Sequence, residues 1–212
     1  MPHRKTIIWD WNGTLLDDAE ICRISINKML TKRDLPVLSL DEYRTVFAFP
    51  VMEYYKKVGF DFEKEDWDTV AMEFINLYLI ALPECGLTDF ATETLETFKQ
   101  KGYRQAIISA MQHEALLKSV KDLGIFHYFD YIGGIGDHYA HSKVDNAKNY
   151  FTQAQLDPEK VALIGDTIHD SEVAAELQCK CILVATGHQS FTRLATTGLN
   201  VINNLSEIQL NF

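Results

Sequence analysis

With 212 residues, of which 47% are hydrophobic, the chain can bury a sizeable core, and its composition argues against disorder. A net charge of −10 disfavours nucleic-acid binding, because an acidic surface repels phosphate backbones. Four scattered cysteines fit neither a disulfide framework nor a zinc site, and no apolar run reaches membrane-spanning length. We therefore expect a cytoplasmic protein, monomeric or dimeric, with no nucleic-acid or membrane partner.

The first predicted element is a strand at 6–9, where a short apolar run ends on Asp10. The segment that follows has apolar residues at helical spacing in three stretches, 19–30, 51–58 and 67–81. A helix with one apolar stripe must bury it, so these helices should pack as a small bundle. We expect this bundle to form a cap over the carboxyl edge of a sheet.

Further along the chain, short apolar runs alternate with helical patterns. The runs predict strands at 103–108, 131–133, 161–164, 181–184 and 201–202. Strands that alternate with helices form a parallel sheet with helices on both faces. The predicted fold is therefore α/β, a Rossmann-like doubly wound parallel sheet. Residues 1–16 and 87–212 would form this core domain, and residues 17–86 the inserted all-helical cap domain.

Several chemically active side chains follow predicted strands or begin a helix: Asp10, Ser109, Lys143, Asp166 and Asp170. The carboxyl ends of the strands in such a sheet converge on one crevice, which would bring these residues together. Three carboxylates repel one another unless a cation is present, and hard oxygen ligands favour Mg²⁺. A metal ion and a lysine together neutralise a phosphoryl group, which an anionic oxygen can then attack. The set predicts an aspartyl-phosphate intermediate on Asp10, later hydrolysed by water.

The neighbours of these residues are expected to bind the phosphoryl group. Ser109 and Thr14 can donate hydrogen bonds to its oxygens, and Ala110 stands beside Ser109. Gly13 permits a tight turn that presents main-chain N–H groups. Lys143 supplies positive charge, with Lys148 as an alternative. The segment 47–50, Phe-Ala-Phe-Pro, is a candidate for substrate contact from the cap.

Taken in order, these residues match a family pattern: Asp10-Trp11-Asn12-Gly13-Thr14, Ser109, Lys143, and Gly165-Asp166 with Asp170. The chain resembles the haloacid dehalogenase superfamily, specifically phosphatases with a helical cap after the first strand. Gly165-Asp166-Thr167 followed by Ala174-Ala175 is similar to phosphoglycolate-phosphatase-like members. The resemblance implies a small-molecule phosphate ester as substrate and Asp10 as nucleophile. It also implies Mg²⁺ held by Asp10, Asp166 and the main-chain oxygen of Asn12, with Asp170 in support.

Asn12 departs from the family pattern. Phosphatases of this family carry an aspartate there, which protonates the leaving alkoxide and then deprotonates the attacking water. An amide does neither, because it does not titrate near neutral pH. General acid–base catalysis typically contributes ~10²–10⁴ in rate. We expect magnesium binding and phosphoryl transfer to persist, and turnover to slow for poor leaving groups.

Several substitutes for the missing acid remain open. A cap residue can supply the proton, the candidates being Tyr54, Tyr55, Lys56 and Lys57. The substrate can instead have a good leaving group, as an acyl phosphate does, or be a phosphonate, whose family members use a cap lysine. A phosphate-binding pseudoenzyme is the competing function. A phospho-accepting signalling domain and a metal-free dehalogenase fit the motifs less well. We expect structural or surface roles, rather than catalytic ones, for the histidines near the crevice, His113, His141, His169 and His188.

Overall fold

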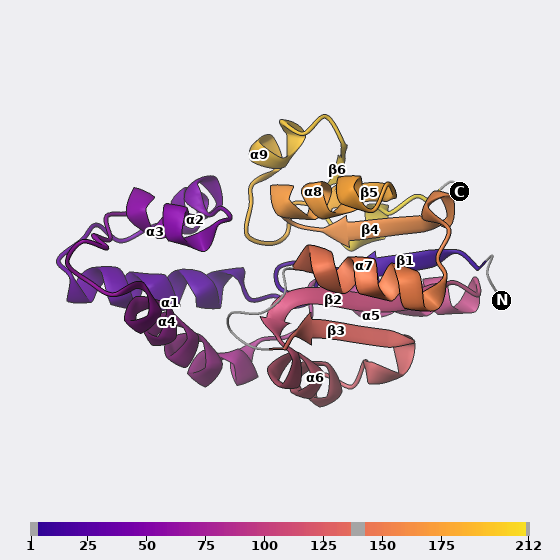
Figure 1. Ribbon diagram of the computed structural model, residues 1–212, viewed down its shortest axis with the longest axis horizontal. Coiled ribbons are helices and arrows are strands. Elements are labelled where there is room, and N and C mark those ends of the chain that lie inside the picture. The colour runs from indigo at the N-terminus through magenta and orange to yellow at the C-terminus, as the bar shows by residue number, and fades with distance from the viewer. Residues whose placement is uncertain (1–3, 137–142, 211–212) are drawn as a thin grey trace.

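The computed structural model describes residues 4–136 and 143–210 (Figure 1). Within these residues, six parallel strands form one sheet in the order β3-β2-β1-β4-β5-β6. They are β1 (Thr6–Trp9), β2 (Arg104–Gln112), β3 (Tyr131–Ile135), β4 (Val161–Gly165), β5 (Lys180–Val184) and β6 (Asn200–Ile202). The predicted doubly wound parallel sheet is confirmed, and β1 lies at its centre.

Helices cover both faces of the sheet, because successive side chains of a strand point to opposite faces. Ile7 and Trp9 of β1 pack into a cluster with α5 (Ala91–Gln100) and α6 (His113–Asp122). Ile8 packs into a second cluster with α7 (Lys143–Ala154) and α8 (Ile168–Glu176). The short helix α9 (Phe191–Ala195) lies beside β6. Since both faces are buried, the strands are almost wholly apolar, and polar side chains gather at their ends.

The chain between β1 and α5 is helical and forms a separate lobe, drawn in violet at the left of Figure 1. Its helices are α1 (Ala19–Lys32), α2 (Leu40–Val46), α3 (Val51–Lys57) and α4 (Trp67–Ala81). The apolar stripe predicted in α1 is buried in the lobe's own core with Tyr43, Tyr55 and Val70. No helix in the described residues is long and apolar enough to cross a membrane.

Two paired segments join the helical lobe to the sheet. Leu16 and Leu87 form an isolated antiparallel bridge, and the Asp17 N–H donates to the Gly86 carbonyl at 3.0 Å. The chain therefore leaves and re-enters the core at one place. We propose this crossing as the boundary between the core, 1–16 and 87–212, and the cap, 17–86.

The strand β2 is longer than its predicted range of 103–108. It continues to Gln112, and its pairing with β3 shifts register between Ile108 and Gln112. Ser109 therefore does not end the strand. It lies where regular pairing stops, in an irregularity of the kind that re-aims side chains at the edge of a sheet.

The cap contacts the loop that follows β5. The guanidinium of Arg44 in α2 donates to the carbonyls of Thr186 at 2.8 Å and Gly187 at 2.9 Å. From the core side, Arg193 donates to the Thr45 carbonyl at 2.9 Å. These bonds hold α2 over the carboxyl ends of the strands, where the predicted site residues lie.

Candidate active site

Three buried carboxylates meet at the carboxyl ends of β1 and β4. Oxygens of Asp10, Asp166 and Asp170 all lie within 4.8 Å of one another. The Asp10 N–H donates to the Ile164 carbonyl at 2.8 Å, which fixes it in line with the sheet. Asp166 follows β4, and Asp170 lies in the first turn of α8. The strand ends thus bring together acids that are 156 residues apart in sequence, from position 10 to position 166.

Lys143 neutralises part of this charge. Its Nζ lies 2.5 Å from Asp10 Oδ1 and 2.5 Å from Asp170 Oδ1, and its side chain is only 5% exposed. Burial lowers the pKa of Lys143, but Asp10 and Asp170 outweigh it and raise the pKa, so the group stays protonated. Lys148 instead pairs with Glu176 on the surface at 2.8 Å. Lys143 is therefore the lysine that the fold delivers to the acids.

The acids remain short of positive charge. Burial raises the pKa of Asp10 well above its usual range, against the opposing effect of Lys143. Burial also raises the pKa of Asp166 to about 6. Burial acts in the same direction on Asp170, but Lys143 and hydrogen bonds from Thr167 lower its pKa overall. One lysine among three buried carboxylates leaves a site of hard oxygen donors with excess negative charge, and this donor set fits Mg²⁺.

Donors already reach both oxygens of Asp170 and both oxygens of Asp166, but of the two only Asp170 accepts from Lys143. Asp170 Oδ1 faces Lys143, and its Oδ2 accepts from the Thr167 N–H at 3.0 Å and hydroxyl at 2.7 Å. Asp166 accepts from the Thr14 hydroxyl at 3.1 Å and the His188 N–H at 2.6 Å. Asp170 is thus placed to hold Lys143, which agrees with a supporting role in metal binding.

Glycines allow two loops to close on Asp166. A Cβ atom on Gly13 would lie 2.3 Å from Asp166 Oδ2, and one on Gly187 would lie 2.1 Å from it. Gly13 also has φ +72°, a conformation that residues with side chains rarely adopt. The backbone turn predicted at Gly13 is therefore present, but its N–H donates to Asp18 Oδ1 at 2.8 Å. The Thr14 hydroxyl likewise faces Asp166, and neither residue lines the cavity described below.

The Asn12 side chain is held by a carboxylate that the sequence analysis missed. Its Nδ2 donates to Asp18 Oδ2 at 2.7 Å and to the Tyr78 hydroxyl at 2.7 Å. Its Oδ1 accepts from the Ser109 hydroxyl at 3.3 Å. An amide supplies the donor that Asp18 requires, whereas an aspartate at position 12 would set two carboxylates against each other. The asparagine that departs from the family pattern at position 12 is therefore the hydrogen-bond donor to Asp18.

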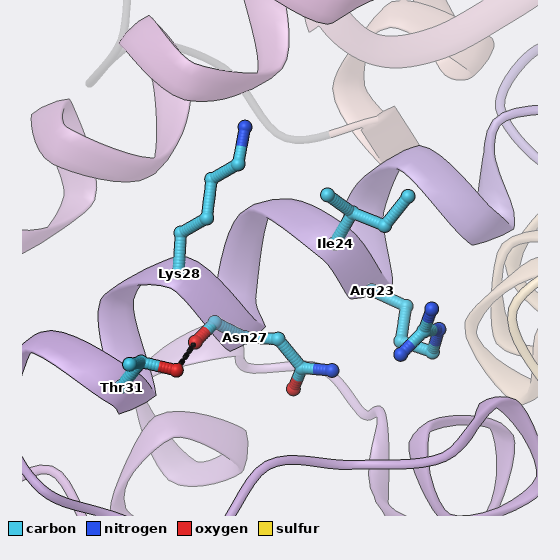
Figure 2. Close-up of a pocket in the computed structure, with 5 residues that line it drawn as sticks. All are labelled: Arg23, Ile24, Asn27, Lys28 and Thr31. Carbon is cyan, nitrogen blue, oxygen red and sulfur yellow. Dashed lines mark hydrogen bonds between the residues drawn. The ribbon is translucent and has the colours of Figure 1, made fainter.

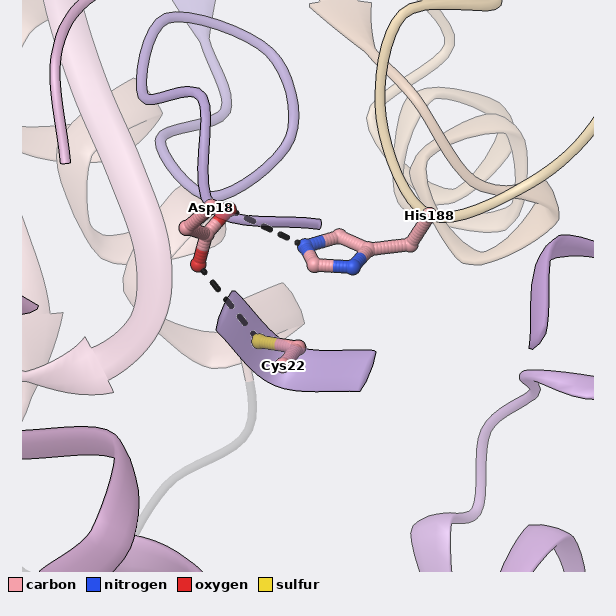
Figure 3. Close-up of side chains that lie close together, drawn as sticks. All are labelled: Asp18, Cys22 and His188. Atoms are coloured by element: carbon pink, nitrogen blue, oxygen red, sulfur yellow. Dashed lines mark hydrogen bonds and ion pairs between the residues drawn. The ribbon is translucent and has the colours of Figure 1, made fainter. Parts of the chain in front are cut away.

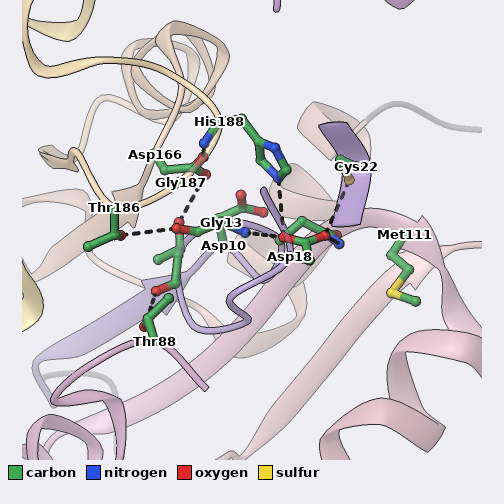
Figure 4. Close-up of polar contacts among 12 residues, drawn as sticks. Asp10, Gly13, Asp18, Cys22, Thr88, Met111, Asp166, Thr186, Gly187 and His188 are labelled. Atoms are coloured by element: carbon green, nitrogen blue, oxygen red, sulfur yellow. Dashed lines mark hydrogen bonds and ion pairs between the residues drawn. The ribbon is translucent and has the colours of Figure 1, made fainter. Parts of the chain in front are cut away.

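Asp18 is the centre of this network, and Figure 4 shows its contacts with Gly13, Cys22 and His188. It precedes α1 and would ordinarily cap that helix, but its side chain makes no capping hydrogen bond. It instead accepts from the Gly13 N–H, from Asn12 and from the Tyr78 hydroxyl, the last at 2.8 Å. Burial raises the pKa of Asp18, but His188 and these donors outweigh it and lower the pKa. Asp18 is therefore an anchor carrying fixed negative charge rather than a proton donor.

His188 completes the network, with Nε2 3.3 Å from Asp18 Oδ1 (Figure 3). Its Nδ1 lies 2.8 Å from the Tyr43 hydroxyl of α2. Burial lowers the pKa of His188, but Asp18, Asp166 and Asp10 together raise it to about 9. Cys22 Sγ lies 3.8 Å from Asp18 Oδ2, and burial raises the pKa of this thiol, which stays neutral. Hydrogen bonds explain this cluster without a metal ion.

A cavity of about 570 Å³ lies between the acids and the cap. Predicted site residues that line it are Asp10, Asn12, Ser109, Ala110, Lys143 and Asp166. The cap contributes Phe47, Phe49, Tyr54 and Tyr55, all predicted candidates for substrate or proton contact. Lys56 and Lys57 do not line it, and Lys56 pairs with exposed Glu53. The cap lysine that a phosphonate substrate would use is thus not among the lining residues of the described chain.

The histidines predicted near the crevice lie in different places. His188 and His169 line the cavity, and His169 pairs with Glu172 at 2.9 Å. His113 does not line it, and His141 lies outside the described residues.

A second hollow lies on the outer face of α1, away from the acids (Figure 2). Three of its polar residues are engaged locally: Arg23 and Asn27 donate to the Leu38 carbonyl, and the Thr31 hydroxyl donates to the Asn27 carbonyl at 2.8 Å. It holds none of the predicted site residues.

Comparisons with known proteins identify a matching family model, similar sequences and a similar fold. The family model for haloacid dehalogenase-like hydrolases matches residues 7–184. A phosphoglycolate phosphatase of Aquifex aeolicus is 28% identical over 190 residues, which are 87% of this chain and 86% of that protein. The tyrosine-protein kinase PtkA of Mycobacterium tuberculosis is 24% identical over 95% of this chain and 69% of that protein. The crystal structure of a predicted phosphatase from Clostridium acetobutylicum superposes with a TM-score of 0.77 at 22% identity, covering 96% of this chain and 95% of that one.

Proposed function

The chain belongs to the haloacid dehalogenase-like hydrolase family, and on that premise we propose that it is a Mg²⁺-dependent phosphatase of small phosphomonoesters. The observation that carries the proposal is Lys143, which bridges Asp10 and Asp170 beside Asp166 in a buried cavity. A surface ion pair would not need this burial. A phosphoryl site does, because charges act more strongly where water is excluded.

In the proposed reaction, an Asp10 oxygen attacks phosphorus, and the bond from phosphorus to the ester oxygen breaks. The electron pair leaves with that oxygen, and the phosphoryl group stays on Asp10 until water hydrolyses it. Lys143 pairs with Asp10 and favours its ionised form, and it would face the phosphoryl oxygens together with the Ser109 hydroxyl, which donates to Asn12 in the structure. Asp10, Asp166 and the main-chain oxygen of Asn12 would hold Mg²⁺, with Asp170 in support, and the bound ion supplies charge that screens the phosphoryl group.

Asn12 provides neither the acid of the first step nor the base of the second. Its amide is committed to Asp18 and Tyr78, so it neither protonates the leaving oxygen nor activates water. We propose that hydrolysis of the phosphorylated Asp10 limits turnover. We also propose a cytoplasmic location, as the sequence predicts.

Magnesium-dependent release of phosphate from a panel of phosphomonoesters tests this function. Asp10→Asn should abolish release, whereas Asp17→Asn, which changes an exposed neighbour, should retain it. An Asp10→Asn variant as active as the wild type would remove the assigned nucleophile.

The competing function is a phosphate-ligand binder, which the engagement of Asn12 with Asp18 favours. It predicts that inorganic phosphate with Mg²⁺ raises the unfolding temperature while the whole panel stays unhydrolysed. Turnover of any member of the panel that depends on Asp10 rules it out.

A further inference from the structure

The walls of the cavity indicate the kind of alcohol that the phosphate ester carries, an inference that rests on the proposed function. Drug-sized ligands occupy pockets of ~300–1,000 Å³, and this cavity has about 570 Å³. A phosphate on a two-carbon acid would leave much of that space unfilled. The space therefore belongs to the part of the substrate beyond phosphorus.

The cap side of the cavity is aromatic and apolar. Its lining residues from α3, α4 and the loop before α3 include Phe47, Phe49, Val51, Tyr54, Tyr55, Trp67, Ala71, Met72, Phe74, Ile75 and Leu79. Several of these rings already meet edge to face, as Phe47 and Tyr54 do at 5.3 Å between centroids. Aromatic faces and edges favour a further ring in such offset or edge-on arrangements.

Among the residues that the structure describes, the cap side of the cavity offers no lysine or arginine to a substrate carboxylate. Within the described residues, Lys143 is the one lysine or arginine that lines the cavity, and it is bound to Asp10 and Asp170. The segment 137–142, which the structure does not describe, contains neither lysine nor arginine. The charged cap residues that line the cavity are Asp18 and Asp68, which repel an anion, and His188 of the core is already paired with Asp18. A buried carboxylate without a cation is costly, so a phosphorylated small acid such as phosphoglycolate fits this cavity poorly.

One polar group in the wall lacks a partner. Tyr54 is 3% exposed, and its hydroxyl has no hydrogen-bond partner among the described residues. Because that oxygen is itself shielded from solvent, it presents no polar contact to the cavity, and the wall stays apolar toward a ligand.

The amide at position 12 points to the same class of substrate by a separate route. An alkoxide resembles hydroxide and leaves poorly without a proton, since water has a pKa of ~15.7. A phenol has a pKa of ~10, so its oxide leaves without help from an acid. Asn12 provides no proton to the leaving group, and its amide is hydrogen-bonded to Asp18. An aromatic leaving group therefore removes the need for the acid that this chain lacks.

We propose that the substrate is a phosphate monoester of a phenol, with the ring seated in the wall formed by α3, α4 and Phe47. Asp10 displaces the aryl oxide, which takes its proton from solvent. Water then attacks the phosphorus of the aspartyl phosphate, regenerating the Asp10 carboxylate and releasing phosphate.

The test compares phenyl phosphate, 1-naphthyl phosphate, cyclohexyl phosphate and phosphoglycolate on the full chain with Mg²⁺. We expect kcat/KM for either aryl ester to exceed that for the other two by about 100-fold or more, because they need the missing acid. Naphthyl phosphate should exceed phenyl phosphate by about tenfold through KM, since it buries a second ring. Their kcat values should be equal, because both form the same phosphorylated Asp10.

Two variants of α4 separate the fit of the ring from the reactivity of the ester. Met72→Lys places a cation in the cavity wall and should reduce the preference for naphthyl over phenyl phosphate to near one. Ile80→Lys lies on the same helix, 79% exposed and outside the cavity lining, and should leave the preference unchanged.

The outcomes distinguish this inference from the function on which it rests. Hydrolysis of phosphoglycolate or cyclohexyl phosphate at least as efficient as that of the aryl esters would overturn the inference and leave the phosphatase intact. Equal kcat/KM for phenyl and naphthyl phosphate would remove the ring site. Failure to hydrolyse every ester would contradict the proposed function itself.

Discussion

Replacing Asn12 by aspartate restores the residue type of the family pattern, yet the structure predicts that this single change is harmful. The Asn12 Nδ2 lies 2.7 Å from Asp18 Oδ2, so Asn12→Asp brings two carboxylate oxygens into contact in a buried network. At that separation and an effective dielectric constant of ~20, the repulsion is about 6 kcal/mol.

Protonation of one carboxyl relieves the repulsion at a smaller cost. Holding a proton at pH 7 on a group with an ordinary pKa of ~4 costs about 4 kcal/mol, because each pKa unit is 1.36 kcal/mol. We therefore expect Asn12→Asp to lower the free energy of unfolding by about 3–4 kcal/mol at pH 7. The loss should shrink as the pH falls toward ~4, where an ordinary carboxyl also binds a proton.

The exchanged pair is the matched control. In Asn12→Asp/Asp18→Asn, the amide and carboxylate swap places, and Tyr78 can donate to position 12, from which it now accepts. Urea unfolding should be measured for the wild type, both single variants and the double variant. The free energy of unfolding of the double variant should return to within about 1 kcal/mol of the wild type, which corresponds to a large coupling energy between the two positions. Asp17→Asn, which alters an exposed neighbour, should behave as the wild type. An Asn12→Asp variant of full stability, or a pair no more stable than it, would refute the reasoning.

Two further predictions concern protons and metal. The folded-state pKa of His188, about 9, lies above its ordinary value of 6.5, so its contribution to stability is fully present below pH 6.5 and is lost as the pH rises through 9. Thermal unfolding in EDTA should show that the wild type loses up to ~3 kcal/mol of its free energy of unfolding between pH 6.5 and 9. His188→Gln should lose little over the same range. Equal losses in both proteins would disprove the assignment. Mg²⁺ at about ten times its Kd should stabilise the fold by ~1.4 kcal/mol and raise the unfolding temperature by roughly 3–5 °C, an effect that should vanish in Asp166→Asn and persist in Asp17→Asn. An unchanged magnesium response in Asp166→Asn would show that the ion binds elsewhere.

The sheet was predictable because its strands are buried on both faces. Such strands appear in a sequence as short apolar runs, and the residue after the run marks the carboxyl edge. Asp10 and Asp166 were found in this way. The extension of β2 past Ser109 was not, because its last residues are partly exposed and lose the apolar signal.

The role of Asp18 could not be predicted from local sequence. An aspartate before a helical stripe is a common helix cap, and nothing nearby indicates that its side chain turns inward instead. Its partners Tyr78 and His188 are 60 and 170 residues away, at distances that only the fold sets. The orientation of Thr14 toward Asp166 is of the same kind.

The aromatic wall of the cavity also could not be predicted from the sequence. Tyr54, Tyr55 and the stripe of α4 have the spacing of buried helix residues, and several are indeed buried in the cap. Periodicity identifies the face of a helix that avoids water. It does not show which residues on that face leave a cavity between them, since that depends on how α3 and α4 meet the core.

The most direct test of the account is the site of the phosphoryl group during turnover. The full chain, mixed with Mg²⁺ and 1-naphthyl phosphate and quenched in acid within the first turnovers, is digested and its peptides are analysed by mass spectrometry. Slow hydrolysis predicts that a large share of the protein carries one phosphoryl group, located on Asp10, with a matching burst of naphthol. Steady release of naphthol and phosphate with Asp10 unmodified, or with the group on another residue, would contradict it.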